Sequence, residues 1–168
     1  MFREMRRKKQ ALSREESLQV LRRGTSGVLA VSGDGGYPYA VPLSYVCDGD
    51  KIFFHCARMG HKLDAIARNE KVSFCVIDQD QIVQEEYTSY FRSVIVFGRA
   101  RILQDDGERR RALGLLAARY SPDQAQAQRL HAVEKELGAV CMLELAIEHM
   151  SGKEAVELAR AKQSRAGI

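Results

Sequence analysis

A glycine, a histidine and a lysine stand together where a short helix is expected to begin. Gly60, His61 and Lys62 follow an apolar run and open the segment 60–69, in which apolar residues recur at helical spacing. The first four N–H groups of a helix have no partners within it, and with the helix dipole they attract anions. Cations at that end oppose the dipole unless an anion joins them. The pattern therefore indicates an anion site, the open alternative being a helix start that simply faces solvent.

The energetics of such a site favour a particular class of anion. The helix dipole contributes about 0.3–1 kcal/mol, and charge-assisted hydrogen bonds from Lys62, His61 and Arg58 would add about 1.5–3 kcal/mol each. A micromolar ligand needs about 8 kcal/mol in total, so the remainder must come from burying an apolar ring system. These residues therefore favour a phosphate attached to a large planar ring over free phosphate.

His55 is the second residue that could take part in chemistry, because it lies in the strand that leads to the helix start at Gly60. It is either an active-site histidine or a barrel histidine that bonds to neighbouring backbone, and the sequence leaves both open. The six-residue spacing between His55 and His61 is not a metal-ligand spacing, so no metal is expected. No Ser/His/Asp order and no paired acids indicate a hydrolase.

Composition sets broad limits on the class of protein. The 168 residues, 45% hydrophobic and 29% charged, suit a single globular domain over residues 1–168. No apolar run reaches the ~20 residues that span a bilayer, and the N-terminus lacks the apolar stretch of a secretory signal. We therefore expect a cytoplasmic protein with no membrane partner. The four cysteines are widely spaced and are interpreted as small core residues; they are Cys47, Cys56, Cys75 and Cys141.

The net charge of +4 owes much to a basic arm over residues 1–10. Such an arm can bind nucleic acid electrostatically. No recognition motif accompanies it, so we expect a solvated or flexible terminus and no nucleic-acid partner.

The elements that must position these residues are short strands joined mostly by hairpins. Alternation and apolar runs predict six strands, over residues 27–31, 37–45, 52–57, 71–77, 93–103 and 139–147. Helices are expected before, between and after them, two of them between the fifth and sixth strands. Hairpin connections favour a mainly β (α+β) fold, a six-stranded antiparallel barrel with flanking helices, over a doubly wound sheet.

Several local signals mark where these elements begin and end. Ser13 and Glu16 form a capping box for the first helix, and Gly24 is expected to end it in a left-handed conformation. The polar stretch 78–86 is predicted to be a loop, and Gly98 predicts a bulge or a close backbone approach. Two more helix starts are expected, at Ser121-Pro122 and at a capping box of Ser151 and Glu154.

Four segments together resemble the pyridoxamine-phosphate-oxidase-like flavoproteins. Residues 35–45 are similar to the second barrel strand of that family, and residues 53–57 with 60–62 are similar to its phosphate-binding strand and helix. Residues 92–100 resemble the strand that ends on a glycine before the chain leaves the barrel. Residues 147–155 resemble the branch that includes nitroimidazole-resistance proteins. The resemblance covers residues 24–161, and the order and spacing of the motifs make it specific.

This resemblance implies a split barrel, a homodimer and FMN in a groove between the subunits. It assigns the phosphate to His61 and Lys62, and the flavin ring to contacts with Pro42, Leu43, Ser44 and Tyr45. It places His55, Cys56 and Ala57 beneath the phosphate and ribityl chain, and brings Ser93 and Val94 to the ring from the partner subunit. His61 stands where the vitamin oxidase has an arginine, and the C-terminal arginine and histidine that hold its substrate have no match. Vitamin B6 oxidation is therefore not expected.

The expected function is an FMN-dependent oxidoreductase that reduces small nitroaromatic or similar molecules, with His55 as the candidate catalytic residue. The alternative is a non-catalytic protein that stores or senses flavin or haem on the same barrel, with His55 as an axial haem ligand. FAD and deazaflavin are further alternatives to FMN as the cofactor.

Overall fold

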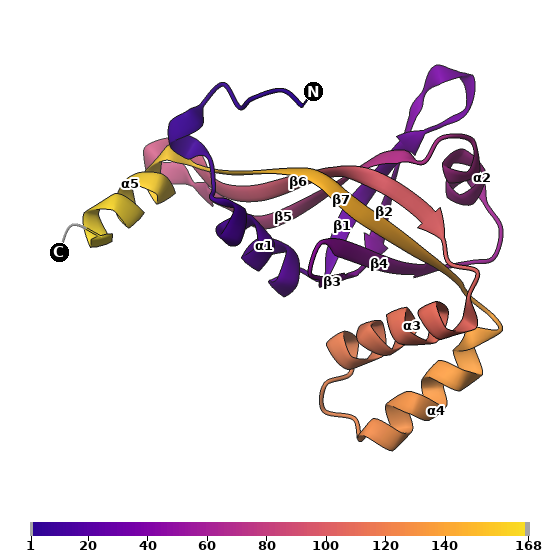
Figure 1. Ribbon diagram of the computed structural model, residues 1–168. Coiled ribbons are helices and arrows are strands. Elements are labelled where there is room, and N and C mark those ends of the chain that lie inside the picture. The colour runs from indigo at the N-terminus through magenta and orange to yellow at the C-terminus, as the bar shows by residue number, and fades with distance from the viewer. Residues whose placement is uncertain (1, 167–168) are drawn as a thin grey trace.

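The computed structural model describes residues 2–166, which form a seven-stranded antiparallel sheet with helices around it (Figure 1). The strands are β1 (Ser26–Ser32), β2 (Pro38–Ser44), β3 (Val46–Asp48), β4 (Lys51–Cys56), β5 (Lys71–Val83), β6 (Thr88–Ile102) and β7 (Cys141–Glu154). Their order is β2-β1-β5-β6-β7-β4-β3, and the unclosed, curled sheet is the expected split barrel. It has one strand more than expected, because β3 pairs with β4 as a short strand of its own.

Five helices and three single turns complete the described chain. The helices are α1 (Arg14–Arg23), α2 (His61–Arg68), α3 (Asp106–Tyr120), α4 (Gln126–Leu137) and α5 (Val156–Ala166), and the 3-10 turns are η1 (Lys8–Gln10), η2 (Asp34–Gly36) and η3 (Gln84–Glu86). Helices α3 and α4 form a hairpin that lies below β4 in Figure 1. Helix α2 lies at the opposite end of the sheet from α5 (Figure 1). Among residues 2–166, no helix is both long and apolar enough to cross a membrane.

Strand alternation divides the apolar side chains into two clusters. Along β4, Ile52, Phe54 and Cys56 point into the barrel and join its core, where Phe54 packs edge-on against Phe74. Phe53 points the other way and packs under α3 and α4 with Leu113, among others. The hairpin of helices is therefore attached to the outside of the barrel by a separate small core.

The hairpin of β5 and β6 is longer than the sequence predicts. Residues 78–86 are mostly strand rather than the expected loop, because β5 runs on to Val83 and pairs with Thr88. Tyr87 closes the turn with φ 50. Side chains such as Ile82 are exposed there, so the extension lacks the buried face that makes a strand recognisable by apolar alternation.

The predicted starts and ends of the helices are confirmed in one case and wrong in three others. The capping box of Ser13 and Glu16 is confirmed, with both hydrogen bonds present. Gly24 is extended (φ −65, ψ 154) rather than left-handed. Helix α4 begins at Gln126, later than predicted. Ser151 and Glu154 lie inside β7, where Glu154 pairs with Arg92 of β6 instead of capping a helix.

Gly98 is confirmed as both a bulge and a close backbone approach. The β6–β7 register shifts between Phe97 and Gly98. A Cβ added at Gly98 would lie 2.0 Å from the carbonyl oxygen of Ala146, so only glycine fits at this position.

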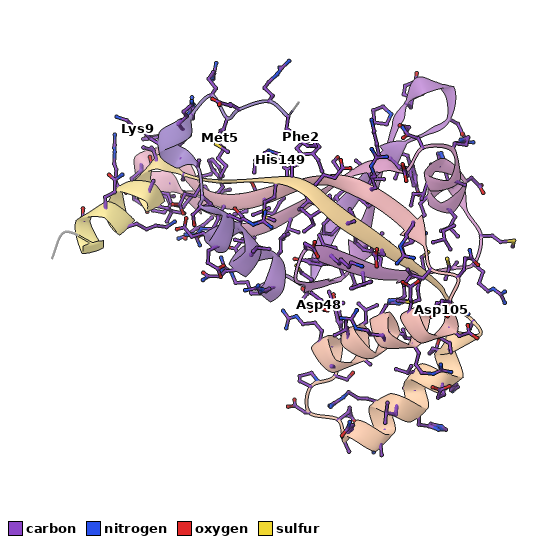
Figure 2. The ribbon with its side chains drawn as sticks, in the orientation of Figure 1. Phe2, Met5, Lys9, Asp48, Asp105 and His149 are labelled. Atoms are coloured by element: carbon purple, nitrogen blue, oxygen red, sulfur yellow. The ribbon has the colours of Figure 1, made fainter. Side chains whose placement is uncertain are left out.

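The basic arm is folded onto the sheet. Its η1 turn precedes a bridge between Ala11 and Lys153. The Phe2 ring stacks on His149, with centroids 4.6 Å apart and planes 8° from parallel (Figure 2). The basic side chains of residues 3–9 are exposed.

Candidate flavin-phosphate site

Helix α2 begins with a conformation that only glycine adopts readily. Gly60 has φ 138 and ψ 167 and caps the helix without any side-chain hydrogen bond. Its carbonyl oxygen accepts from the N–H groups of Leu63 and Asp64 at 2.9 and 3.2 Å. The first turn of α2 therefore presents its free N–H groups beyond Gly60, as an anion site requires.

Lys62 is half-buried on this first turn and has no ion-pair partner among residues 2–166. Burial raises the pKa of the Cys56 thiol to about 11, and the Lys62 charge opposes the rise. An unneutralised cation at a helix N-terminus opposes the dipole. An anionic ligand would neutralise the charge of Lys62 and accept hydrogen bonds from the N–H groups.

His61 is held against the turn between β1 and β2. Its ring stacks on Tyr39 with centroids 4.2 Å apart, and its Nε2 lies 3.5 Å from a carboxylate oxygen of Asp34. Asp34 is also paired with Arg68 at 2.6 Å. The buried Nε2 of His61 makes no hydrogen bond within the described chain. This atom could therefore form a hydrogen bond with a ligand.

The segment 55–57 divides between two faces of the sheet. His55 is exposed on the outer face, where it borders an apolar cavity of about 180 Å³ between β4, α3 and α4. Cys56 points into the core, and Ala57 is exposed just after the strand. The structure thus places His55 toward the helical hairpin and His61 toward the turn before β2.

The four β2 candidates also alternate between faces. Pro42 and Ser44 are exposed, and Leu43 is half-buried toward the core. Tyr45 is fully buried, and its hydroxyl donates to the carbonyl of Leu21 at 2.8 Å. A ligand at β2 would meet Pro42, Ser44 and the main chain, because β2 is an edge strand with one unpaired side.

Ser93 and Val94 lie near the middle of β6, well away from α2. Lys71, which follows α2 closely, pairs with Arg99, whereas Ser93 pairs with Ile77 six residues further along β5. Six residues of strand span about 20 Å. Val94 faces the core and is buried, and Ser93 is half-buried. One chain therefore does not bring Ser93 or Val94 to Lys62.

Sequence reasoning missed the residues that hold the candidates in place. Tyr39 and Asp34 fix the ring of His61, and the Tyr120 hydroxyl accepts from the N–H of Tyr45 at 2.9 Å. The partners in these contacts are 22 to 75 residues apart. The only available signal was the position of Asp34 in a glycine-rich turn beside the strand that carries Tyr39.

The outer face of the sheet carries exposed apolar side chains and a large open groove. Val28, Ile77, Ile95 and Phe97 are all more than a third exposed on β1, β5 and β6. The groove measures about 830 Å³ and runs from the β1–β2 turn past Phe97 to Glu148 of β7. Contiguous apolar surface of this kind marks interaction surfaces in proteins.

A family model described as pyridoxamine 5'-phosphate oxidase matches residues 13–154. The chain belongs to the pyridoxamine 5'-phosphate oxidase family. No curated protein matches it. The match covers both the α2 corner and the edge strand β2, so these features lie within the part of the chain shared with the family.

Solved structures agree with this membership. An FAD-binding protein from Mesorhizobium loti is 27% identical, with a TM-score of 0.61 over 86% of this chain and 96% of its own. An FAD- and haem-binding protein from Mycobacterium smegmatis is 26% identical, with a TM-score of 0.68 over 88% and 73%. A proposed 5-nitroimidazole antibiotic resistance protein from Bacteroides thetaiotaomicron, 19% identical, has a TM-score of 0.72 over 86% of both chains and shows the shared fold.

Proposed function

We propose that this family member binds FMN, with the cofactor phosphate at the first turn of α2. The observation that carries the proposal is the half-buried Lys62, which has no ion-pair partner among residues 2–166, at a helix start that no side chain caps. The buried, unbonded Nε2 of His61 lies on the same turn. A phosphate ester supplies the charge and the acceptor atoms that these groups lack, so the residues present fit the group.

The flavin ring is proposed to lie along β2. Pro42 and Ser44 are exposed there, and the unpaired side of the strand offers main-chain hydrogen bonds to the polar edge of a ring. A bound flavin supplies hydride transfer, which no amino-acid side chain provides. The residues of this chain bind and orient it, and the apolar surface around them excludes water. His55 faces the helical hairpin rather than β2, so a catalytic role for it at this ring stays a prediction.

The complete site is proposed to need a homodimer. Ser93 on β6 lies three strands from β2 in the sheet order, about 14 Å at ~4.8 Å per strand, so it can contact a ring bound along β2 only from a second copy. The exposed Val28, Ile95 and Phe97 provide an apolar face for that copy. Dilution to monomers is then expected to release the flavin, measured as a rise in free-flavin fluorescence. Full occupancy in a monomer at equilibrium would contradict the shared site.

The visible spectrum of the purified protein tests flavin binding directly, since flavin gives two visible bands. Lys62→Ala is expected to weaken FMN binding by about 1.5–3 kcal/mol, the value of a lost charge-assisted hydrogen bond. Affinity is measured by titration of the apoprotein. Lys135→Ala on α4 is the matched control, because it removes an exposed cation far from α2 and should leave affinity unchanged. Unchanged affinity in Lys62→Ala would place the phosphate elsewhere.

A second candidate function is storage or sensing of flavin or haem without turnover. It is favoured by the apolar cavity that His55 borders, and by the Mycobacterium smegmatis relative, which is named for binding both FAD and haem. An intense Soret band that disappears in His55→Ala would support haem ligation. Bound flavin that no pyridine nucleotide reduces would support storage. Mass analysis of the released cofactor separates FMN from FAD and deazaflavin.

A further inference from the structure

Two cysteines that are far apart in the sequence face each other across the sheet. Cys56, the last residue of β4, is the direct partner of Cys141, the first residue of β7. Directly opposed residues in an antiparallel pair have Cα atoms about 4.5–5.5 Å apart. A disulfide needs Cα atoms about 4.4–6.8 Å apart, so the backbone spacing already suits one.

The two thiols also lie on the same face of the sheet. Cys56 belongs to the barrel core, and Cys141 packs against that same core. The other two cysteines have different neighbours, since Cys47 is opposite Ile52 and Cys75 is opposite Ile95. All four are free thiols. Within residues 2–166, Cys56 and Cys141 are therefore the one pair of cysteines opposed across a ladder.

The two thiols differ in their access to solvent. Cys141 is half-buried and lines an open cavity of about 600 Å³ beside Gly60 and Arg109. Cys56 is buried, and burial raises its pKa to about 11, with the neighbouring Cys141 thiol adding to the rise. An oxidant that enters the cavity therefore meets Cys141 first, and Cys56 is placed to react second.

We propose that Cys56 and Cys141 form a reversible thiol–disulfide site that reacts with hydroperoxides. The Cys141 sulfur attacks the peroxide, the O–O bond breaks, and a sulfenic acid forms, while the proton of the Cys141 thiol leaves with the expelled alkoxide or hydroxide as an alcohol or water. The Cys56 sulfur then attacks the sulfenic sulfur, and its thiol proton leaves with the expelled hydroxide as water. Two thiols are oxidised, one peroxide is reduced, and an added dithiol reverses the reaction. Because Cys56 immediately precedes the 57–60 loop, the disulfide ties the approach to α2 onto β7.

The experiment uses the reduced full-length protein, cofactor-free or loaded, treated with a small molar excess of hydrogen peroxide. The intact mass is expected to fall by about 2 Da, and dithiothreitol should restore it. Peptide mapping without reduction should join the peptides that contain Cys56 and Cys141. Cys141→Ser and Cys56→Ser should abolish the mass loss, whereas Cys75→Ser, the matched control on β5, should retain it.

Three outcomes would overturn the proposal. The first is no mass loss in the wild-type chain, and the second is a disulfide that involves Cys47 or Cys75. The third is a gain of oxygen atoms at Cys141 with no disulfide, which would mean that Cys56 does not reach the sulfenic acid. All three are read on the wild-type protein, so they do not depend on whether a serine variant folds. None depends on flavin binding.

Discussion

A continuous chain of ion pairs at one end of the sheet contrasts with a lysine at the other end that has no ion pair among residues 2–166. At the end near α1 and α5, acids and bases alternate in a continuous chain of contacts, Glu16–Lys162–Glu154–Arg92–Asp78–Arg23. At the α2 end, Lys62 has no ion-pair partner among the residues that the structure describes. At the first end, these six charges satisfy one another within one chain. The second leaves a cation that a ligand can satisfy.

The ion pairs at the end of the sheet near α1 and α5, called the paired end here, involve a buried carboxylate and are expected to stabilise the fold. The carboxylate of Glu154 is only 3% exposed and contacts Arg92 at 3.0 Å and Lys162 at 2.6 Å. Hydrogen bonds from Arg23, and then from Arg92, hold the pKa of Asp78 below its usual range against the effect of its burial. The almost fully buried carboxylate of Glu154 is thus neutralised by two cations of the same chain.

Breaking the paired end should have the largest effect. Glu154→Gln removes the buried anion and leaves Arg92 and Lys162 without it. Since both cations still reach solvent, we expect the low end of the cost of breaking a buried pair, about 3 kcal/mol of unfolding free energy. Urea denaturation measures the loss, with Glu85→Gln in the exposed η3 turn as the control. A loss no larger than in that control would show that the chain of charges is not structural.

Changing the start of α2 should have a smaller and more local effect. Gly60→Ala forces a side chain into φ 138, which costs about 1–3 kcal/mol. Hydrogen exchange of the α2 amides should accelerate more than that of the β5 amides. Gly138→Ala is the matched control, because Gly138 has an ordinary φ of −78 and open space around an added Cβ. Equal effects of the two substitutions would argue against strain at Gly60.

Acid should weaken the paired end, and this is the smallest expected effect. Hydrogen bonds from Lys162, and then from the Ser13 backbone, lower the pKa of Glu16 from 4.5 to about 2. A lowered pKa in the folded state stabilises the protein above pH 4.5, and this contribution is lost as the pH falls through about 2. Because Glu16 is 38% exposed, the contribution should not exceed about 1 kcal/mol.

The Glu16→Gln variant distinguishes the effect of the Glu16 charge from the effect of its capping hydrogen bond. Glutamine at that position can still bond to the N–H of Ser13, but it does not titrate. The variant should therefore show a flatter dependence of urea midpoint on pH between 5 and about 2. A dependence as steep as that of the parent protein would assign the titration to another carboxyl.

Some local signals in the sequence predicted local structure correctly, whereas those at Gly24 and at Ser121-Pro122 did not. The capping box of Ser13 and Glu16 and the bulge at Gly98 each follow from the chemistry of one or two residues, and both are present. The helix start at 60–62 was placed correctly for the same reason. The antiparallel split barrel followed from the order of elements, because hairpins restrict the topology.

The remaining features depend on contacts between distant residues. Glu154 lies in a strand because Arg92 pairs with it across the ladder, which no local pattern reveals. The strand extension from Asp78 to Val83 has no buried face that would give it an apolar alternation. The opposition of Cys56 and Cys141 appears only when β4 and β7 are brought together, so widely spaced cysteines were interpreted as unrelated core residues.

The distance along the sheet between Lys62 and Ser93 has a genetic consequence. In a two-fold dimer, each ligand site would take Lys62 from one chain and Ser93 from the other. A cell that produces one chain defective at Lys62 and another defective at Ser93 would assemble mixed dimers in which one site carries both defects and the other carries neither. With random pairing, about a quarter of all sites would be intact, so two alleles that are each inactive alone would complement one another.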